Sequence, residues 1–402
     1  MKDTKHSIPW IFKALIVLYI FHTTIPIFGY LVPAVVHAAV VFILFVLLAT
    51  YDSSFKKNFI LITPITIIYI LNMVYSGFSN FAIYFYSLLQ LWLFPLLALF
   101  LMRYANTKVL KRILLLICFS YIATSITTVI GNQVYPGASR LIAAVFQSDE
   151  TYVYDVYMMM NIGGFNFVYS MVLMTPIVIY MLRRRDIPRL FSLVLLICII
   201  AVVYYTDYTT AFLSFLFTIV GLLFLRKAFG GRQVATYMVF ILLVVLFFDE
   251  FVFPYLSSFG GLLGSENINA RLTELSDFSV SDTSTYEGDL GSRYEIYKRS
   301  LIEFSKSPIW GSPNAKVGGH SYVFDVLGKF GLFGALCLIW MYRRLFNVFY
   351  KPFFGTNCYG YVSFVFGLAV LLAILNPKDN LSVLTFMIPV AALYFTKRSQ
   401  RI

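Results

Sequence analysis

Long apolar runs alternate with short polar breaks along most of the chain. A helix that crosses the hydrocarbon core of a bilayer needs roughly 20 mostly apolar residues. Twelve segments approach or reach this length, and we expect each of them to form a membrane-spanning helix. They are residues 10–29, 32–50, 58–76, 81–102, 113–131, 161–182, 190–206, 208–225, 234–252, 321–342, 358–375 and 381–396.

Two connections between the apolar runs are much longer than the others. The first covers residues 132–160, and the second, residues 253–320, is polar through most of its first half. Near its end, Tyr294, Tyr297, Leu301 and Phe304 recur at helical spacing, with charged residues on the opposite side. This pattern predicts an amphipathic helix over about residues 291–306, which lies along the membrane surface and ends before Ser307-Pro308.

The composition agrees with an integral membrane protein. Hydrophobic residues make up 60% of the 402 residues, and the mean hydropathy is +0.80. These values exclude a soluble domain with a polar surface. We therefore expect an all-α protein with about 12 transmembrane helices, forming one polytopic domain over residues 1–402.

The charges predict how the chain is oriented. Most of the 31 Lys and Arg residues fall in the terminal segments and in every second connection between the predicted spans. Of the acidic residues, only Asp3, Asp52 and Asp186 lie in these same segments. By the positive-inside rule, both termini are cytoplasmic and the two long segments are on the outer face. The net charge of +12 therefore reflects orientation, and we expect no nucleic-acid partner.

The sequence has none of the common motifs for binding a metal or a nucleotide cofactor. The four cysteines lie in or beside apolar runs, so we expect neither a disulfide framework nor a metal cluster. The chain has no phosphate-binding P-loop and no GxGxxG motif. We expect no cofactor, and a function carried out on the outer face by the long segments.

Two residues of the second long segment are candidates for catalysis. Arg293 lies at the rim of the apolar stripe, where its planar guanidinium could hold a diphosphate; the alternative is an arginine that reaches toward the membrane surface. His320 follows Gly318-Gly319 and directly precedes an apolar run, where it could accept and return a proton; the alternative is a helix cap.

Other polar groups suggest substrate contacts or structural roles. Asp207 and Tyr208 lie at the outer end of a predicted span, and an acidic residue at that depth is a functional candidate. Asp325 and Lys329 are four residues apart on one helical face, and we interpret them as a structural pair that neutralises itself. Gly328, Gly331 and Gly334 recur at intervals of three, which suits close packing of helices.

Several of these segments together resemble a known family. An Arg-x-x-x-Tyr helix is followed by "SPIWG", by a glycine turn "GGHS", and by a span that contains "GKFGLFG". Their order over about residues 291–334 is similar to the C-terminal signature of the bacterial O-antigen ligase and Wzy-type polysaccharide polymerase superfamily.

The resemblance implies a GT-C-like polytopic glycosyltransferase in the bacterial plasma membrane. Its substrates would be oligosaccharides linked to undecaprenyl diphosphate, its chemistry would need no metal, and a chain-length regulator is a possible partner besides membrane lipid. By the family's pattern, Arg293 would bind the diphosphate and His320 would act as base or position the acceptor. Tyr294, Tyr297, Asp207 and Tyr208 are the accompanying substrate-binding candidates.

The chain departs from the family's pattern at one place. Family members often have an arginine after the span that corresponds to the seventh, where this chain reads "TDYTT". Arg140 and Arg271 are the outer-face candidates to replace it. Because that arginine is associated with ligases, we predict a repeat-unit polymerase, with an O-antigen ligase or a lipid-linked oligosaccharide flippase as alternatives.

Overall fold

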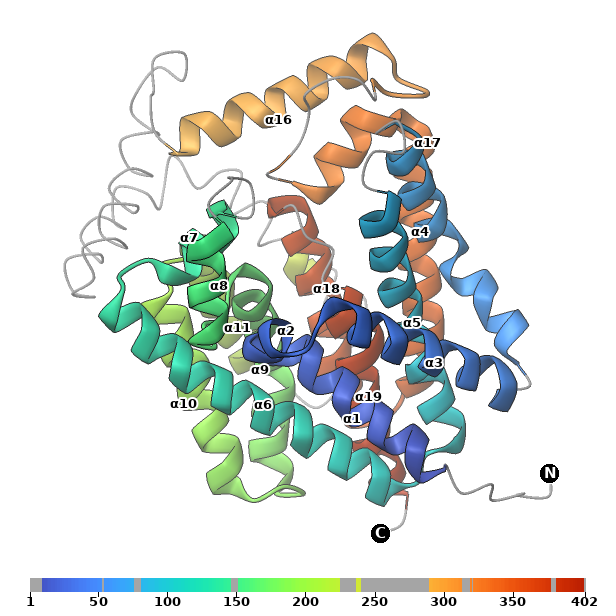
Figure 1. Ribbon diagram of the computed structural model, residues 1–402, viewed down its shortest axis with the longest axis vertical. Coiled ribbons are helices and arrows are strands. Elements are labelled where there is room, and N and C mark those ends of the chain that lie inside the picture. The colour runs from blue at the N-terminus through green and yellow to red at the C-terminus, as the bar shows by residue number, and fades with distance from the viewer. Residues whose placement is uncertain are drawn as a thin grey trace. The chain divides into compact units, whose positions relative to one another are not determined.

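The computed structural model describes residues 9–52, 54–75, 81–145, 151–224, 236–239, 289–312, 319, 321–376 and 381–400 (Figure 1). Throughout these ranges the regular structure is helical, and none of the described residues forms a strand. The prediction of an all-α protein is therefore confirmed. The chain divides into two compact units, and the single polytopic domain stays a prediction.

Unit 1 comprises residues Met1–Thr206, Trp340–Phe366 and Asn380–Ile402. It contains the helices α1 (Trp10–Thr24), α2 (Pro26–Leu31), α3 (Ala34–Tyr51), α4 (Phe55–Tyr75), α5 (Phe81–Tyr104), α6 (Thr107–Val134), α7 (Ala138–Val145), α8 (Thr151–Met159), α9 (Phe165–Arg184), α10 (Arg189–Tyr205) and α19 (Ile388–Ser399), and the short helices η1 (Phe346–Tyr350), η2 (Lys351–Phe353) and η3 (Val383–Met387).

Unit 2 comprises residues Asp207–Ile339 and Gly367–Asp379. It contains α11 (Thr209–Phe224), α16 (Asp289–Lys306), the first part of α17 (Tyr322–Leu345) and the last part of α18 (Tyr359–Leu375).

Helices form at every predicted span except residues 234–252, of which only the helical residues 236–239 are described. Five helical stretches of the described chain are long and apolar enough to cross a membrane. They are Ala34–Tyr51, Phe85–Tyr104, Thr107–Val134, Phe165–Arg184 and Tyr322–Phe353. Such helices indicate a membrane protein, while the number of twelve spans stays a prediction.

The first predicted span is not one continuous helix. Residues 10–29 divide into α1 and α2 at Ile25, whose backbone is extended (φ −120°, ψ 107°). The reason is Pro26, because the ring of a proline disfavours the helical conformation in the residue before it. Pro26 then occupies the first turn of α2, where its missing N–H costs nothing.

The long segment 132–160, for which the sequence predicted no helix, contains regular structure. It includes α7 and α8, and their side chains Ala138, Ile142 and Tyr157 form a small apolar cluster with Ile162. Tyr157, which stands among the acidic and aromatic residues of this segment, is thus a core residue of unit 1. Helices of eight or nine residues are too short to show a clear period in the sequence.

Candidate functional site

The candidate site lies in unit 2, where α16 meets the start of α17 and the end of α18. The side chain of Tyr297 connects the three helices. Its ring lies 5.4 Å from the ring of Phe324 of α17, and its hydroxyl donates a hydrogen bond of 3.5 Å to the carbonyl oxygen of Leu375 of α18. Tyr297 therefore fixes α16 on the ends of two helices.

A helix, α16, forms where the amphipathic helix was predicted, and burial along it follows the predicted stripe only in part. Ser300 is buried, and its hydroxyl donates to the carbonyl of Ile296 at 3.0 Å, whereas Leu301 of the predicted apolar stripe is exposed. On the polar side, Glu303 accepts a hydrogen bond of 2.7 Å from Lys306. This bond, helped by Ser312, lowers the pKa of the Glu303 carboxyl below its ordinary value.

The "SPIWG" segment, residues 307–311, packs backbone against backbone on α17. The N–H of Leu332 donates to the carbonyl of Pro308 at 2.8 Å, and that of Phe333 donates to Ile309 at 3.2 Å. In the opposite direction, the N–H of Ser312 donates to the carbonyl of Gly328 at 2.9 Å. These three bonds join the two separated parts of the family-like signature, residues 307–312 and 328–333.

Two glycines make this contact possible. Gly331 has φ 59° and ψ −150°, which interrupts α17. Gly311 has φ 71°, so both residues occupy conformations that glycine adopts without strain. Gly331 does permit close packing, but its partner is the segment 309–311 rather than another helix, and the residue interrupts α17 where the two backbones meet.

Gly319 and Ser321, the described residues just before α17, form hydrogen bonds with the first turn of that helix. Oδ2 of Asp325 accepts a hydrogen bond of 2.8 Å from the N–H of Gly319, whose φ is 118°. Ser321 caps the helix, because its hydroxyl accepts from the N–H of Phe324 at 3.2 Å. A carboxylate in the first turn is also favoured by the helix dipole.

The predicted pairing of Asp325 with Lys329 is wrong. Both residues are described, and no ion pair joins them. A carboxylate in the first turn of a helix can accept hydrogen bonds from backbone N–H groups that lie just before the helix. Here the donor is the N–H of Gly319. Asp325 therefore shapes the turn in front of the helix.

The end of α18 supports the same turn. The N–H of Tyr322 donates to the backbone carbonyl of Asn376 at 2.8 Å. The Asn376 side chain is buried, and its Nδ2 has no hydrogen-bond partner among the residues that the structure describes. A buried amide donor of this kind is costly unless something binds it.

The side chains of four of the eight predicted catalytic and substrate-binding residues are not described. His320 and Arg271 lie outside the described residues, and so do the side chains of Arg293 and Tyr294, although both of these residues belong to α16. The described neighbours of His320 are Gly319 in the turn and the cap residue Ser321.

The other candidates are described. Tyr297 packs on Phe324, as stated above. Asp207 and Tyr208 form the turn before α11: Asp207 has φ 55°, and the carbonyl of Tyr208 accepts from the N–H of Phe212 at 2.9 Å. Arg140 is half-buried in α7 of unit 1.

Asn376 is the candidate that the sequence did not reveal. It ends an apolar run in the stretch "LNPKDN", residues 375–380, where a proline follows. An asparagine before a proline is an ordinary way to end a helix, so nothing in the sequence singles it out. Only its buried Nδ2, which has no partner among the described residues, distinguishes it.

The described residues contain no group of three or more His, Cys, Asp or Glu side chains that could hold a metal ion. Comparison with known proteins adds no assignment: no protein-family model matches the chain, and no curated protein matches it either. The local geometry is therefore the basis for assigning a function.

Proposed function

We propose that the protein is a membrane glycosyltransferase that polymerises lipid-linked oligosaccharide repeat units. The observation that carries this proposal is the bonding of residues 307–312 to residues 328–333. It joins the segment that follows α16, the helix that contains position 293, to α17, which begins two residues after position 320. This supports the proposal that the two signature segments act together.

The reaction follows from these two residues. A hydroxyl of the acceptor sugar attacks the anomeric carbon of a chain attached to undecaprenyl diphosphate. The new glycosidic bond forms, the bond from carbon to diphosphate oxygen breaks, and the diphosphate leaves with the electron pair. His320 accepts the hydroxyl proton, and Arg293 stabilises the negative charge of the leaving group. Direct attack inverts the anomeric carbon.

The remaining features of the proposal concern topology and substrate contacts. We infer about twelve spans in a GT-C-like arrangement, with both termini on the cytoplasmic side of a bacterial plasma membrane and the site on the outer face. The growing chain is transferred to the non-reducing end of a new repeat unit. Nδ2 of Asn376 supplies a hydrogen bond to the bound substrate, which explains why this buried donor is free of protein partners among the described residues.

The test uses purified protein in lipid nanodiscs with lipid-linked repeat units extracted from a strain that lacks this protein. The proposal predicts products of increasing length and release of undecaprenyl diphosphate. A flippase would leave the repeat units unchanged, and a ligase would consume them only when lipid A core is added. Either outcome would contradict the polymerase assignment.

A further inference from the structure

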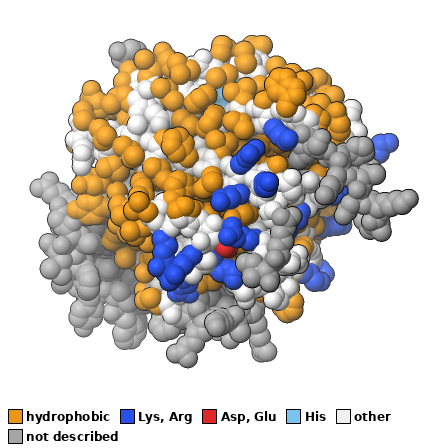
Figure 2. All heavy atoms as spheres, turned by 90° about the horizontal axis from the view of Figure 1, so that it is seen from below, with side chains coloured by type: hydrophobic (Ala, Val, Ile, Leu, Met, Phe, Trp, Pro, Cys, Tyr) orange, Lys and Arg blue, Asp and Glu red, His pale blue; other side chains and the backbone are white. Residues whose placement is uncertain are grey.

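Lys and Arg side chains gather on one face of the molecule, and hydrophobic side chains lie directly beside them (Figure 2). In unit 1, the connection from α9 to α10 contributes the exposed residues Arg183, Arg185 and Arg189, and the start of α6 contributes Lys108 and Arg112. The sequence predicts that both places lie on the cytoplasmic side of the membrane. The carboxylates on that side decide how much of this positive charge the protein itself neutralises.

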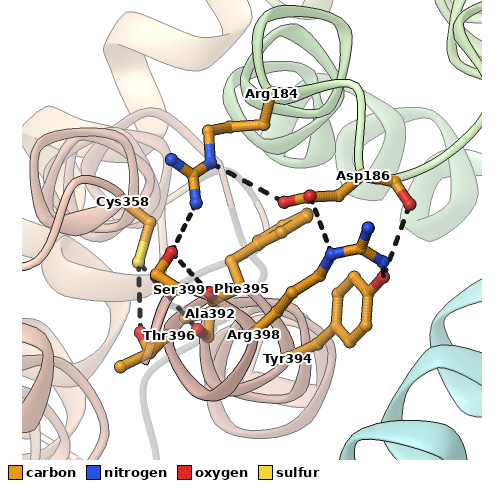
Figure 3. Close-up of polar contacts among 9 residues, drawn as sticks. All are labelled: Arg184, Asp186, Cys358, Ala392, Tyr394, Phe395, Thr396, Arg398 and Ser399. Atoms are coloured by element: carbon orange, nitrogen blue, oxygen red, sulfur yellow. Dashed lines mark hydrogen bonds and ion pairs between the residues drawn. The ribbon is translucent and has the colours of Figure 1, made fainter. Parts of the chain in front are cut away.

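The described carboxylates on the same predicted side are buried and already paired. Nη1 of Arg103 lies 2.8 Å from Oδ1 of Asp52, whose side chain is 4% exposed. Figure 3 shows Asp186 in contact with two arginines: its Oδ1 lies 2.9 Å from Nε of Arg398, and its Oδ2 lies 3.6 Å from Nε of Arg184. The exposed cations therefore keep a clear excess of positive charge.

Two of the exposed cations have no protein partner in the described part of the chain. Arg185 ends α9 in the left-handed conformation (φ 57°), and Arg189 is the first residue of α10. Neither side chain forms a hydrogen bond or an ion pair with a described residue. Arg183, in contrast, donates to the hydroxyl of Tyr361. Arg185 and Arg189 are thus the cations of this connection that can bind an external anion.

An exposed apolar stripe runs along α10 and begins beside Arg189. One side of α10 packs on α9 and α6 and contains its buried residues, among them Leu195, Ile199 and Val202. The other side has exposed apolar residues at helical spacing. They are Leu190, Leu193, Val194, Ile197 and Ile200.

The geometry of a helix places the charge of Arg189 at the end of this stripe. Leu193 follows Arg189 by four residues, so the two side chains are neighbours on one side of the helix. Side chains of a helix lean toward its N-terminus, and a long cationic side chain extends to the polar region of a membrane. The guanidinium therefore extends beyond the apolar stripe.

Cations at the end of an exposed apolar stripe match the two parts of a phospholipid. The stripe suits an acyl chain, and the two arginines suit the phosphate of the head group. An acidic segment of a soluble protein would pair with the arginines but leave the stripe uncovered. We propose that α10 binds an anionic phospholipid, with its phosphate on Arg185 and Arg189 and an acyl chain along Leu193 and Ile197. This site shares no residue with the polymerase proposal.

The test counts the lipids bound to the whole protein by native mass spectrometry in detergent. The probes are phosphatidylglycerol and phosphatidylcholine with the same acyl chains. We expect the wild type to bind phosphatidylglycerol severalfold more tightly than phosphatidylcholine. Arg185→Gln/Arg189→Gln should lose this preference, because each cation near a head group contributes about fivefold in affinity. Arg185→Lys/Arg189→Lys should retain most of it, because the charge is kept.

The matched control is Lys108→Gln/Arg112→Gln. These residues are two exposed cations, four positions apart, on the same unit. They have no apolar stripe beside them, because the next exposed large apolar residue of α6 is Phe119. The control variant should therefore keep the preference for phosphatidylglycerol. An equal loss in both variants would indicate diffuse attraction by the whole cationic face and would overturn the site on α10.

A second probe separates the lipid from its phosphate alone. Glycerol phosphate lacks acyl chains, so it should displace little phosphatidylglycerol from the wild type. If it displaces the lipid as effectively as phosphatidylglycerol itself does, the stripe contributes nothing and the proposal is wrong. Equal binding of the two lipids to the wild type would also overturn it. If the double glutamine variant does not fold, Arg189→Gln replaces it, with an intermediate loss expected and an unchanged preference contradicting the proposal.

Discussion

Gly311 and Gly331 lie in direct backbone contact. A Cβ atom on Gly331 would lie 2.7 Å from the amide nitrogen of Gly311 and 2.6 Å from the carbonyl oxygen of Ile309. A Cβ atom on Gly311 would lie 2.5 Å from the carbonyl oxygen of Lys329. Neither position has room for the side chain of another residue. The segment that follows α16 is therefore in close backbone contact with α17.

Alanine at either glycine should destabilise the protein more than its backbone conformation alone explains. An alanine in the left-handed helical region costs roughly 1–2 kcal/mol, the conformation of Gly331 (φ 59°, ψ −150°) is close to a region that essentially only glycine adopts, and the clash with backbone atoms adds to this cost. Gly355→Ala is the matched control, because Gly355 has φ 79° and a Cβ atom added to it would meet nothing within 4 Å. Thermal unfolding in detergent should give a larger drop for Gly331→Ala than for Gly355→Ala. Equal drops would show that the contact between the two glycines is unimportant.

The position of Gly319, which precedes the proposed base His320 in the chain, should depend on Asp325. Asp325→Ala removes the acceptor for the Gly319 N–H, whereas Asp325→Asn keeps an oxygen in the same place. We expect the alanine variant to lose most polymerising activity and the asparagine variant to keep more of it, because a shifted turn moves the proposed base. The readout is product length in the nanodisc assay. Equal activity of the two variants would show that the hydrogen bond between Gly319 and Asp325 is unimportant for the reaction.

Tyr297 should act mainly as an anchor for α16. Tyr297→Phe keeps the ring on Phe324 and removes the hydroxyl, whose hydrogen bond to the Leu375 carbonyl is long at 3.5 Å, so a cost of about 1 kcal/mol is expected. Tyr297→Ala removes the ring from a half-buried site and should cost about 2 kcal/mol. Stability from denaturant or thermal unfolding checks both values. A Tyr297→Ala protein of wild-type stability without activity would instead indicate a direct contact with substrate.

Asn376 should matter for activity and little for stability. Its buried Nδ2 has no protein partner among the described residues, so replacing the side chain by leucine, which is similar in size, removes an unsatisfied donor. This change should leave the unfolding midpoint unchanged or slightly higher, while the rate of chain growth falls at least severalfold. A parallel fall in stability and activity would assign Asn376 a structural role.

The sequence predicted the helices better than the site. Long apolar runs determine where α3, α5, α6 and α9 form, since nothing but a helix satisfies the backbone of such a segment in lipid. The bonds from Leu332 to Pro308 and from Phe333 to Ile309 could not be predicted, because backbone donors and acceptors are the same at every position. For the same reason, the sequence indicated a packing role for Gly331 and did not predict that α17 is interrupted there.

Polar residues were the other source of error. The spacing of Asp325 and Lys329 suits an ion pair, but the same carboxylate also suits a turn N–H, and spacing alone does not decide between them. Asn376 has no distinguishing neighbour in the sequence, and its importance depends on burial. By contrast, the amphipathic pattern of residues 291–306 predicted α16 closely, because its end is set locally by Ser307-Pro308.

The most direct test of the polymerase assignment is a gel of surface polysaccharide from a strain lacking this protein, complemented with wild type or with His320→Ala, both checked for membrane insertion. The account predicts that the deletion leaves core with a single repeat unit, that wild type restores the ladder of long chains, and that His320→Ala does not. Long chains made in the absence of the protein, or a full ladder with His320→Ala, would contradict it.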